Sequence, residues 1–358
     1  MVTGIAPGRV NLIGEHVDYN GGRCLPLALT RTTTARVSLR ADDLLQATSG
    51  SRSWAGSLDQ LDQDLDDADS WVLYVAGVLL ALDVRTGMDI EISSDVPVGA
   101  GLSSSAALEC SVAVAVDQVL GLGRSPEQLV EACVRAETET VGAPTGGLDQ
   151  AIAIYGQVDH ALLIDFATGV REQVPFAPSA HGLAVLVIDT KVSHELTDGG
   201  YGARRDDAWA AAEQLGLDKR ALAQATSIDG LPEPLLRRAR HVLSEVARVD
   251  DFVAALRVDD WTALGPLLDD SHTSLRDDYE VSCEELDVAV DTAREAGALG
   301  ARMTGGGFGG SAIALVPVER VKAVQSAVAT AFVARGWGEP DFFVAEPGAG
   351  AEVADPRA

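Results

Sequence analysis

A loop of glycines and serines that leads into an apolar helix constrains the fold of this chain more than any other feature. The loop covers residues 97–105, and residues 106–120 are mostly Ala, Val, Leu and Cys. A helix with apolar residues on all sides has to lie inside its domain. Gly99 and Gly101 allow positive φ angles, and free amides at a helix N-terminus attract anions. This stretch therefore predicts a phosphate-binding loop in front of a buried helix.

The loop matches neither of the two common nucleotide-binding patterns. It lacks the lysine of the P-loop, and Ser104 stands where the dinucleotide pattern needs its third glycine. Residues 305–310 do contain G-x-G-x-x-G, but the segment after them is strand-like, whereas a dinucleotide site needs a helix there. A turn in front of a core helix would have the same composition, so the loop alone leaves a purely structural role open.

The charge of the chain restricts its partners. A formal net charge of −27 over 358 residues repels nucleic acid and anionic membranes, so neither is expected as a partner. Screening over about 8 Å at physiological salt still lets a local cluster of amides, arginine and metal hold phosphates. The four cysteines are widely spaced, which favours reduced thiols over a disulfide framework or a zinc site. With no apolar run of membrane-spanning length and no signal-like N-terminus, we expect a cytoplasmic protein.

Two carboxylates stand at positions that suit chemistry. A helix predicted for residues 126–141 begins with the N-cap Ser125 and the capping-box Gln128, and its apolar stripe continues at helical spacing into Glu137. Asp149 follows a glycine pair and precedes an apolar segment. Acids in such places are catalytic candidates. Glu137 could instead lie in water at the edge of the stripe, and Asp149 could be an N-cap.

The remaining pattern divides the chain into two halves of mixed helix and strand. Residues 175–182 concentrate Pro, Ser and Gly, which predicts one domain of residues 1–180 and another of residues 181–358. Apolar spacing predicts strands at 34–41, 88–93, 160–166, 183–189, near 301, at 311–316 and at 341–345, and helices at 203–215, 235–258, 261–268 and 318–334, with one more from a capping box at 282–285 to residue 297. In the second half the order is strand, helix, strand, strand, helix, strand, which is ferredoxin-like.

Three motifs resemble those of the galactokinases, a family of the GHMP kinase superfamily. They are G-R-V-N-L-I-G-E-H-V-D-Y-N at residues 8–20, G-A-G-L-S-S-S-A-A at 99–107 and M-T-G-G-G-F-G-G at 303–310. The first motif is the most specific, because the serine loop is shared by the whole superfamily. Further matches lie at residues 147–150, at Tyr201 with the arginine pair 204–205, and at residues 271–279, so the resemblance runs from about Ile5 to Gly350.

The resemblance implies both a fold and an activity. The fold is α+β, the two-domain GHMP kinase fold, with an N-terminal ribosomal-S5-domain-2-like domain, a C-terminal ferredoxin-like domain and the active site between them. The activity is transfer of the γ-phosphoryl of ATP to the anomeric hydroxyl of α-D-galactose, giving α-D-galactose 1-phosphate in galactose metabolism. The implied partners are galactose, ATP and Mg²⁺, and we expect a monomer.

The matched motifs also imply a role for each site residue. Asp149 matches the catalytic acid residue and Arg9 its cationic neighbour. The other positions fall into three groups: Glu15, His16, Val17, Asp18 and Tyr201 for the sugar; Gly99, Ala100, Gly101, Leu102, Ser103, Ser104 and Ser105 for the phosphates of ATP, with Ser49 near the base; and Ser105 with Glu137 for Mg²⁺. Hydroxyl and carboxylate oxygens are ligands that Mg²⁺ prefers. Val17 departs from the family, which usually has Thr there.

Two other interpretations stay open. A related sugar 1-kinase would act on N-acetylgalactosamine, galacturonate or arabinose, and a non-catalytic sensor would bind galactose and ATP without turnover. A sensor is expected to lose a motif residue, whereas Arg9, Ser105, Glu137 and Asp149 are all present. The residues therefore favour an enzyme over a sensor.

Overall fold

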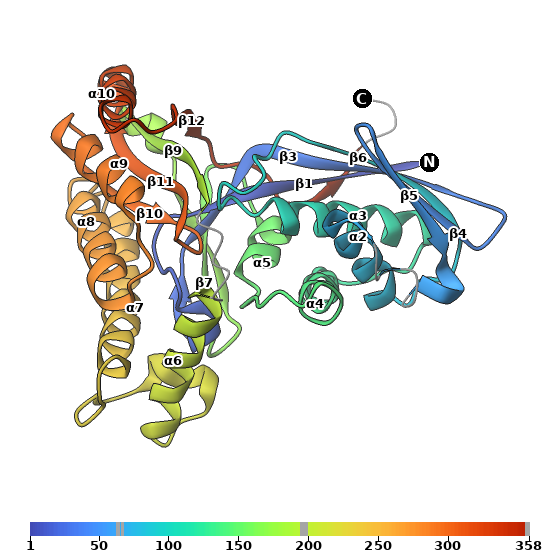
Figure 1. The fold of residues 1–358 in the computed structure, drawn as a ribbon, viewed down its shortest axis with the longest axis horizontal. Helices are drawn as coiled ribbons and strands as arrows, with labels where there is room; N and C mark the ends of the chain where they lie inside the picture. The colour runs from blue at the N-terminus through green and yellow to red at the C-terminus, as the bar shows by residue number, and fades with distance from the viewer. Residues whose placement is uncertain (62–64, 66–67, 194–199, 355–358) are drawn as a thin grey trace.

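The protein consists of two lobes, seen side by side in Figure 1. The computed structural model describes residues 1–61, 65, 68–193 and 200–354. The first lobe is built on a six-stranded sheet with the order β13-β1-β3-β6-β4-β5. Its strands are β1 (Val2–Asn11), β3 (Pro26–Leu39), β4 (Leu44–Ser49), β5 (Arg52–Ser57), β6 (Met88–Ser94) and β13 (Glu352–Val353).

Four helices cover one face of this sheet (Figure 1). They are α2 (Ser70–Ala81), α3 (Ser104–Leu120), α4 (Pro126–Arg135) and α5 (Leu148–Tyr155). Every residue of α3 from Ala106 to Val116 is buried, so the prediction of a buried helix is confirmed. The helix lies so close to β1 that a Cβ on Gly4 would sit 2.2 Å from the carbonyl oxygen of Ser111. This close packing fixes where the N-terminus of α3 can point.

The second lobe has a four-stranded antiparallel sheet with the order β10-β11-β9-β12. The strands are β9 (Leu183–Ser193), β10 (Gly300–Thr304), β11 (Gly309–Pro317) and β12 (Asp341–Ala345), and the helices are α6 (Gly200–Gln214), α7 (Leu235–Arg257), α8 (Leu264–Ser274), α9 (Glu284–Glu295) and α10 (Val321–Ala334). The order along the chain is a strand, a run of helices, two strands, a helix and a last strand. This is the predicted ferredoxin-like order, which is therefore confirmed.

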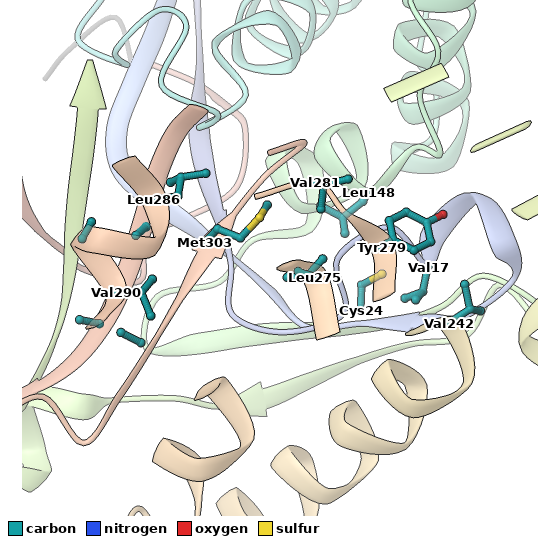
Figure 2. Packing of buried hydrophobic residues seen from close by; sticks show 14 of the residues in the cluster. Val17, Cys24, Leu148, Val242, Leu275, Tyr279, Val281, Leu286, Val290 and Met303 are labelled. Atoms are coloured by element: carbon teal, nitrogen blue, oxygen red, sulfur yellow. The ribbon is translucent and has the colours of Figure 1, made fainter. Parts of the chain in front are cut away.

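The two lobes share part of their core. A three-stranded sheet of β2 (Arg23–Cys24), β7 (His160–Asp165) and β8 (Arg171–Pro175) belongs to neither larger sheet. Figure 2 shows Val17 from the first half of the chain among Val242, Leu275 and Tyr279 from the second, and these side chains belong to one buried cluster. We still propose the boundary near residue 180, which lies in the short 3₁₀ helix η4 (Pro178–His181) between β8 and β9. The end of the chain returns to the first lobe, because the last strand, β13, pairs with β1.

Several local predictions need correction. The helix predicted for residues 126–141 is α-helical only to Arg135 and continues as a π-helical turn, η3 (Ala136–Val141). The capping box at its start is confirmed, but the one predicted at residues 282–285 is wrong. There the hydroxyl of Ser282 donates to Asp287 at 2.5 Å, and Cys283 is the N-cap. The helix predicted for 261–268 begins at Leu264 and runs to Ser274.

Shorter elements complete the chain: 3₁₀ helices η1 (Asp18–Asn20), η2 (Leu58–Gln60), η5 (Lys219–Gln224) and η7 (Val318–Arg320), and a second π-helical turn, η6 (Leu275–Tyr279). Within the described part of the chain, none of the helices combines the length and the apolar character of a membrane span.

Candidate active site

An ion pair between two elements of the first lobe, β1 and α5, marks the centre of the site. Arg9, on β1, donates from Nε to Oδ1 of Asp149 at 2.6 Å and from Nη2 to Oδ2 at 2.8 Å. Such a two-point contact fixes the plane of the carboxylate as well as its distance. Asp149 lies in the first turn of α5, where Gly147 is the N-cap with φ of 94°, so the N-cap alternative for Asp149 is wrong.

The same arginine ties Asp149 to the predicted phosphate loop. Its Nη1 donates to the carbonyl oxygen of Gly101 at 2.5 Å. Burial alone would lower the pKa of Arg9, but the carboxylates of Asp149 and Glu15 outweigh it and raise the pKa above its ordinary value. Arg9 is therefore a permanent cation at the junction of the loop and the acid.

The phosphate loop itself turns through three left-handed residues. Gly99 and Gly101 have φ of 78° and 71°, and Ser103 has φ of 58° although it carries a side chain. Ser103 is the N-cap of α3 but makes no side-chain cap hydrogen bond; its hydroxyl donates to Oδ2 of Asp149 instead. The first amides of a helix have no partner within the helix. The loop therefore ends at the N-terminus of α3, where the first amides have no partner within the helix, as the sequence predicts.

A wide cavity opens beside this N-terminus. It has a volume of about 820 Å³ and is lined by Ser49 on β4, by Ser104 and Ser105 at the start of α3, and by Trp71 and Tyr74 on α2. Cavities of this size commonly hold ligands such as nucleotides. The structure thus brings Ser49 to the same cavity as the serine loop, although about fifty positions separate them in the sequence.

A smaller cavity of about 150 Å³ borders the Arg9–Asp149 pair. It is lined by Arg9, Glu15, His16, Asp18, Glu137, Pro144, Thr145, Leu148, Asp149, Tyr201, Gly305 and Gly306. Four of the five residues predicted to contact the sugar are in this set. The fifth, Val17, is not: its side chain is fully buried in the core cluster of Figure 2 and does not line the cavity.

Glu15 is held in this cavity by the third motif. Its Oε1 accepts a hydrogen bond from the amide of Gly305 at 2.7 Å and another from the hydroxyl of Thr304 at 3.0 Å. The Nη2 of Arg302 lies 3.3 Å from the same oxygen. These contacts orient the carboxylate from the second lobe.

His16 and Asp18 are buried titratable groups, and burial shifts their pKa values in opposite directions. Burial lowers the pKa of His16 to about 3, so the ring is neutral at pH 7; its Nδ1 lies 2.9 Å from the hydroxyl of Tyr19. The ring centroid is 5.3 Å from that of Tyr201. Burial and the neighbouring Asp149 raise the pKa of Asp18 to about 7. The cavity therefore holds acids that ionise reluctantly in the absence of a ligand.

Glu137 lines the smaller cavity and contacts Ser105, which lines the larger one. Ser105 donates to its Oε1 at 3.4 Å, and the residue is only 9% exposed, so the alternative of a solvent-facing Glu137 is wrong. Burial and Asp149 raise the pKa of Glu137 to about 7. A hydroxyl and a carboxylate side by side, with more negative than positive charge around them, fit a divalent cation. No group of three or more His, Cys, Asp or Glu side chains in the described part of the chain could hold a metal by itself.

Sequence reasoning missed two residues behind Glu137. Glu109, within the apolar run of α3, is fully buried, and so is Gln150, next to Asp149 on α5. The Nε2 of Gln150 donates to Oε2 of Glu109 at 3.0 Å and to Oε2 of Glu137 at 2.5 Å. The signal in the sequence that could have found Glu109 is an acid in the middle of the predominantly apolar residues 106–116.

Comparisons with known proteins agree with this geometry. The galactokinase galactose-binding signature matches residues 2–39, the GHMP kinases N terminal domain matches 72–157, and the GHMP kinases C terminal domain matches 252–334. The galactokinase of Streptomyces coelicolor is 45% identical over 97% of this chain and 92% of its own length. The chain belongs to the galactokinase family.

Other relatives extend this comparison. The galactokinase of Mycobacterium tuberculosis is 42% identical, with 94% of each chain covered. The crystal structure of Lactococcus lactis galactokinase complexed with galactose superposes with a TM-score of 0.91 at 34% identity, covering 98% of this chain and 94% of that one. Mevalonate kinase of Methanococcus jannaschii has a TM-score of 0.70 at 18% identity, over 96% of this chain and 97% of that one. The predicted two-domain GHMP kinase fold is therefore confirmed.

Proposed function

We propose that this protein transfers the γ-phosphoryl of ATP to the anomeric hydroxyl of α-D-galactose and releases α-D-galactose 1-phosphate. The observation that carries the proposal is the position of Asp149. Its carboxylate is clamped by Arg9 and lies between the cavity that Glu15, His16, Asp18 and Tyr201 line and the N-terminus of α3. Family membership supports the same reaction.

Asp149 is proposed as the acceptor of the proton on the attacking hydroxyl. The transition state of phosphoryl transfer is loose, so this proton leaves late and positioning matters more than base strength. Arg9 and Ser103 fix both carboxylate oxygens from two sides. Arg9 also neutralises charge on the transferred phosphoryl group, since it reaches the phosphate loop at Gly101.

The phosphates of ATP are proposed to lie on the amides of residues 99–105, with the base in the larger cavity beside Ser49. Ser105 and Glu137 would hold Mg²⁺, which neutralises charge on the phosphates when bound. Because buried carboxylates without a cation are costly, the raised pKa of Glu137 is consistent with a group that ionises when the cation arrives.

The sugar is proposed to be galactose because the small cavity is acidic. Glu15, Asp18 and Asp149 all line it. Neutral hydroxyls are good partners for carboxylates, whereas galacturonate would bring a fourth carboxylate into the cavity and should be repelled. Arabinose lacks the C6 hydroxymethyl group, which leaves an acceptor unpaired at a cost of about 1–3 kcal/mol. Glucose inverts the 4-hydroxyl, and sites built on such hydrogen bonds can discriminate by about 10⁴-fold.

Galactose-dependent release of ADP from ATP tests the proposal. We expect the order galactose first, arabinose and N-acetylgalactosamine weak, and glucose and galacturonate near background in kcat/KM. A preference for N-acetylgalactosamine or galacturonate would overturn the choice of sugar and keep the kinase mechanism. Binding of galactose and ATP with no ADP release would instead identify a sensor.

We also propose that the protein acts in the cytoplasm as a monomer, without nucleic-acid or membrane partners. The net charge of −27 supports the last two points, because the field around the protein repels polyanions.

A further inference from the structure

We infer that Gln150 is a positioning residue for Glu137, and that Glu109 and Thr145 set the direction in which the Gln150 amide points. The inference rests on the proposed function, because it gives Glu137 the role of a Mg²⁺ ligand. It concerns two fully buried polar side chains, Glu109 and Gln150, that line neither cavity and that the proposed reaction leaves unexplained.

The carboxylate of Glu137 is held at both oxygens. Oε1 accepts from Ser105 on α3, and Oε2 accepts from Nε2 of Gln150 on α5 at 2.5 Å. Two contacts from two helices fix the plane of the carboxylate, so that Oε1 stays beside the hydroxyl with which it would share a cation. A ligand oxygen that is pre-oriented binds a metal more tightly than one that must be ordered first.

An amide can do this only if its NH₂ end faces the carboxylate. The two ends of a glutamine amide have nearly the same shape, and a half-turn would present an oxygen to Glu137 and repel it. In the structure Nε2 of Gln150 donates to Oε2 of Glu109 at 3.0 Å. The hydroxyl of Thr145 lies 3.5 Å from Oε1 of Gln150. An acceptor at one end and a donor at the other leave one favourable orientation.

The burial of Glu109 argues for a functional reason. It has no exposed surface, and the packed residues around it on α3 are apolar, among them Cys110 and Val112. Replacing a buried polar or charged group by a well-packed apolar residue is often neutral or stabilising. Stability alone therefore does not explain a carboxyl at this position. Because Ser105 and Glu109 are four residues apart, they lie on the same side of α3, and the side chain can reach behind the proposed metal ligands.

Three variants separate orientation of the amide from a general structural role. Glu109→Leu removes the acceptor from Gln150, whereas Glu109→Gln keeps one acceptor oxygen of the same reach and replaces the other oxygen with an amide nitrogen. Gln150→Met keeps the volume and removes the donor to Glu137. The measurement is the dissociation constant of Mn²⁺, used in place of Mg²⁺, in the presence of a non-hydrolysable ATP analogue, followed by electron paramagnetic resonance. Galactose affinity and thermal unfolding are measured on the same samples.

We expect Glu109→Leu and Gln150→Met to weaken Mn²⁺ binding by about tenfold, which corresponds to about 1.4 kcal/mol. Glu109→Gln should stay within about twofold of the original chain, and galactose affinity should be unchanged in all three. Wild-type Mn²⁺ affinity in Gln150→Met would overturn the inference, even if Glu109→Leu failed to fold. An equal loss of galactose and Mn²⁺ binding would also overturn it, because that result indicates general disruption. If the unmodified chain released no ADP with galactose, the proposed function would fail instead.

Discussion

The sugar side and the nucleotide side of the active site are held in different ways. The phosphate loop is one continuous segment, residues 99–105, whose shape follows from its own left-handed residues and from the helix it begins. The sugar loop, residues 11–20, is held mainly from the second lobe. Arg302 donates to the carbonyl oxygen of Leu12 at 3.0 Å, and the amide of Gly14 donates to Glu245 at 2.9 Å. The backbone of the phosphate loop is therefore shaped by its own residues and is then anchored by Arg9 and by Ser311, whose hydroxyl donates to the carbonyl oxygen of Ala100 at 2.7 Å, whereas the sugar loop depends on the second lobe for its position.

The long-range contacts include a buried charge network. Arg302 and Glu245 have no exposed surface. Burial opposes ionisation of Glu245, but the cations of Arg302 and Arg248 outweigh it and lower its pKa to about 2. Arg302 in turn lies beside Glu15 in the sugar cavity. Removing one member of such a network leaves the others uncompensated, which is far more costly than losing an exposed pair.

The largest effect is expected at Asp149, where the two sides meet. Asp149→Asn keeps the size of the side chain but removes its charge and its ability to take a proton. Turnover should fall by about 10²–10⁴-fold, while binding of a nucleotide analogue and thermal unfolding stay close to normal. Steady-state ADP release and analogue binding measure the two quantities. Near-normal turnover would show that Asp149 is not the proton acceptor.

The next effect should fall on the sugar side alone. Glu245→Gln removes the charge that balances Arg302, and we expect a loss of about 3–5 kcal/mol in the free energy of unfolding. The KM for galactose should rise by about tenfold, with the KM for ATP little changed. The control is Glu172→Gln, which breaks the exposed pair with Arg257 and should change neither quantity measurably. An equal rise of both KM values in Glu245→Gln would contradict the division between the two sides.

This division also explains what could be predicted from the sequence. The serine loop and the buried helix behind it follow from one short segment with its own backbone requirements. The Arg9–Asp149 pair joins residues 140 positions apart, and only the resemblance to the galactokinases implied it. The contacts of Glu245, Arg302 and Gln150 could not be predicted. They depend on which segments pack together, and Gly14 and Glu245 are 231 positions apart.

Two further details of the structure could not be predicted from the sequence for a similar reason. Val17 lies within the sugar motif, but the 3₁₀ turn η1 that begins after it directs its side chain into the core. The helix around Glu137 has apolar spacing that fits an ordinary α-helix, yet its last turn is π-helical. Such turns are common at functional sites, and packing of the acid against Ser105 and Gln150 accompanies this one.

A smaller effect is expected on the nucleotide side. Ser105→Ala and Glu137→Gln each remove one proposed oxygen ligand, so the Mg²⁺ concentration needed for half-maximal activity should rise by about tenfold or more in both, at least as much as the loss expected for the positioning residue Gln150. Ser49→Ala, on β4 in the same cavity, should leave the Mg²⁺ curve in place and change the KM for ATP by less than about twofold, since it removes at most one hydrogen bond from a partly exposed residue. An unchanged Mg²⁺ curve for Glu137→Gln would remove that residue from the metal site.

The smallest effect concerns stability: the loss of a residue proposed to bind the sugar should make the protein without ligand more stable. Asp18 ordinarily has a pKa of 3.8, and burial together with Asp149 raises it to about 7 in the folded protein. Between these two values the folded state binds more protons than the unfolded state, so the contribution of Asp18 to stability declines as pH rises from 4 to 7. Above pH 7 the buried carboxylate is ionised and destabilises the protein without ligand.

Asp18→Asn should therefore raise the melting temperature by several degrees at pH 8, at about 2–4 °C for each kcal/mol, and by less at pH 5. Glu131→Gln, an exposed change of the same charge on α4, should leave it unchanged at both pH values. If Asp18→Asn gave the same shift at pH 5 as at pH 8, the gain would come from packing and not from the charge of the sugar cavity.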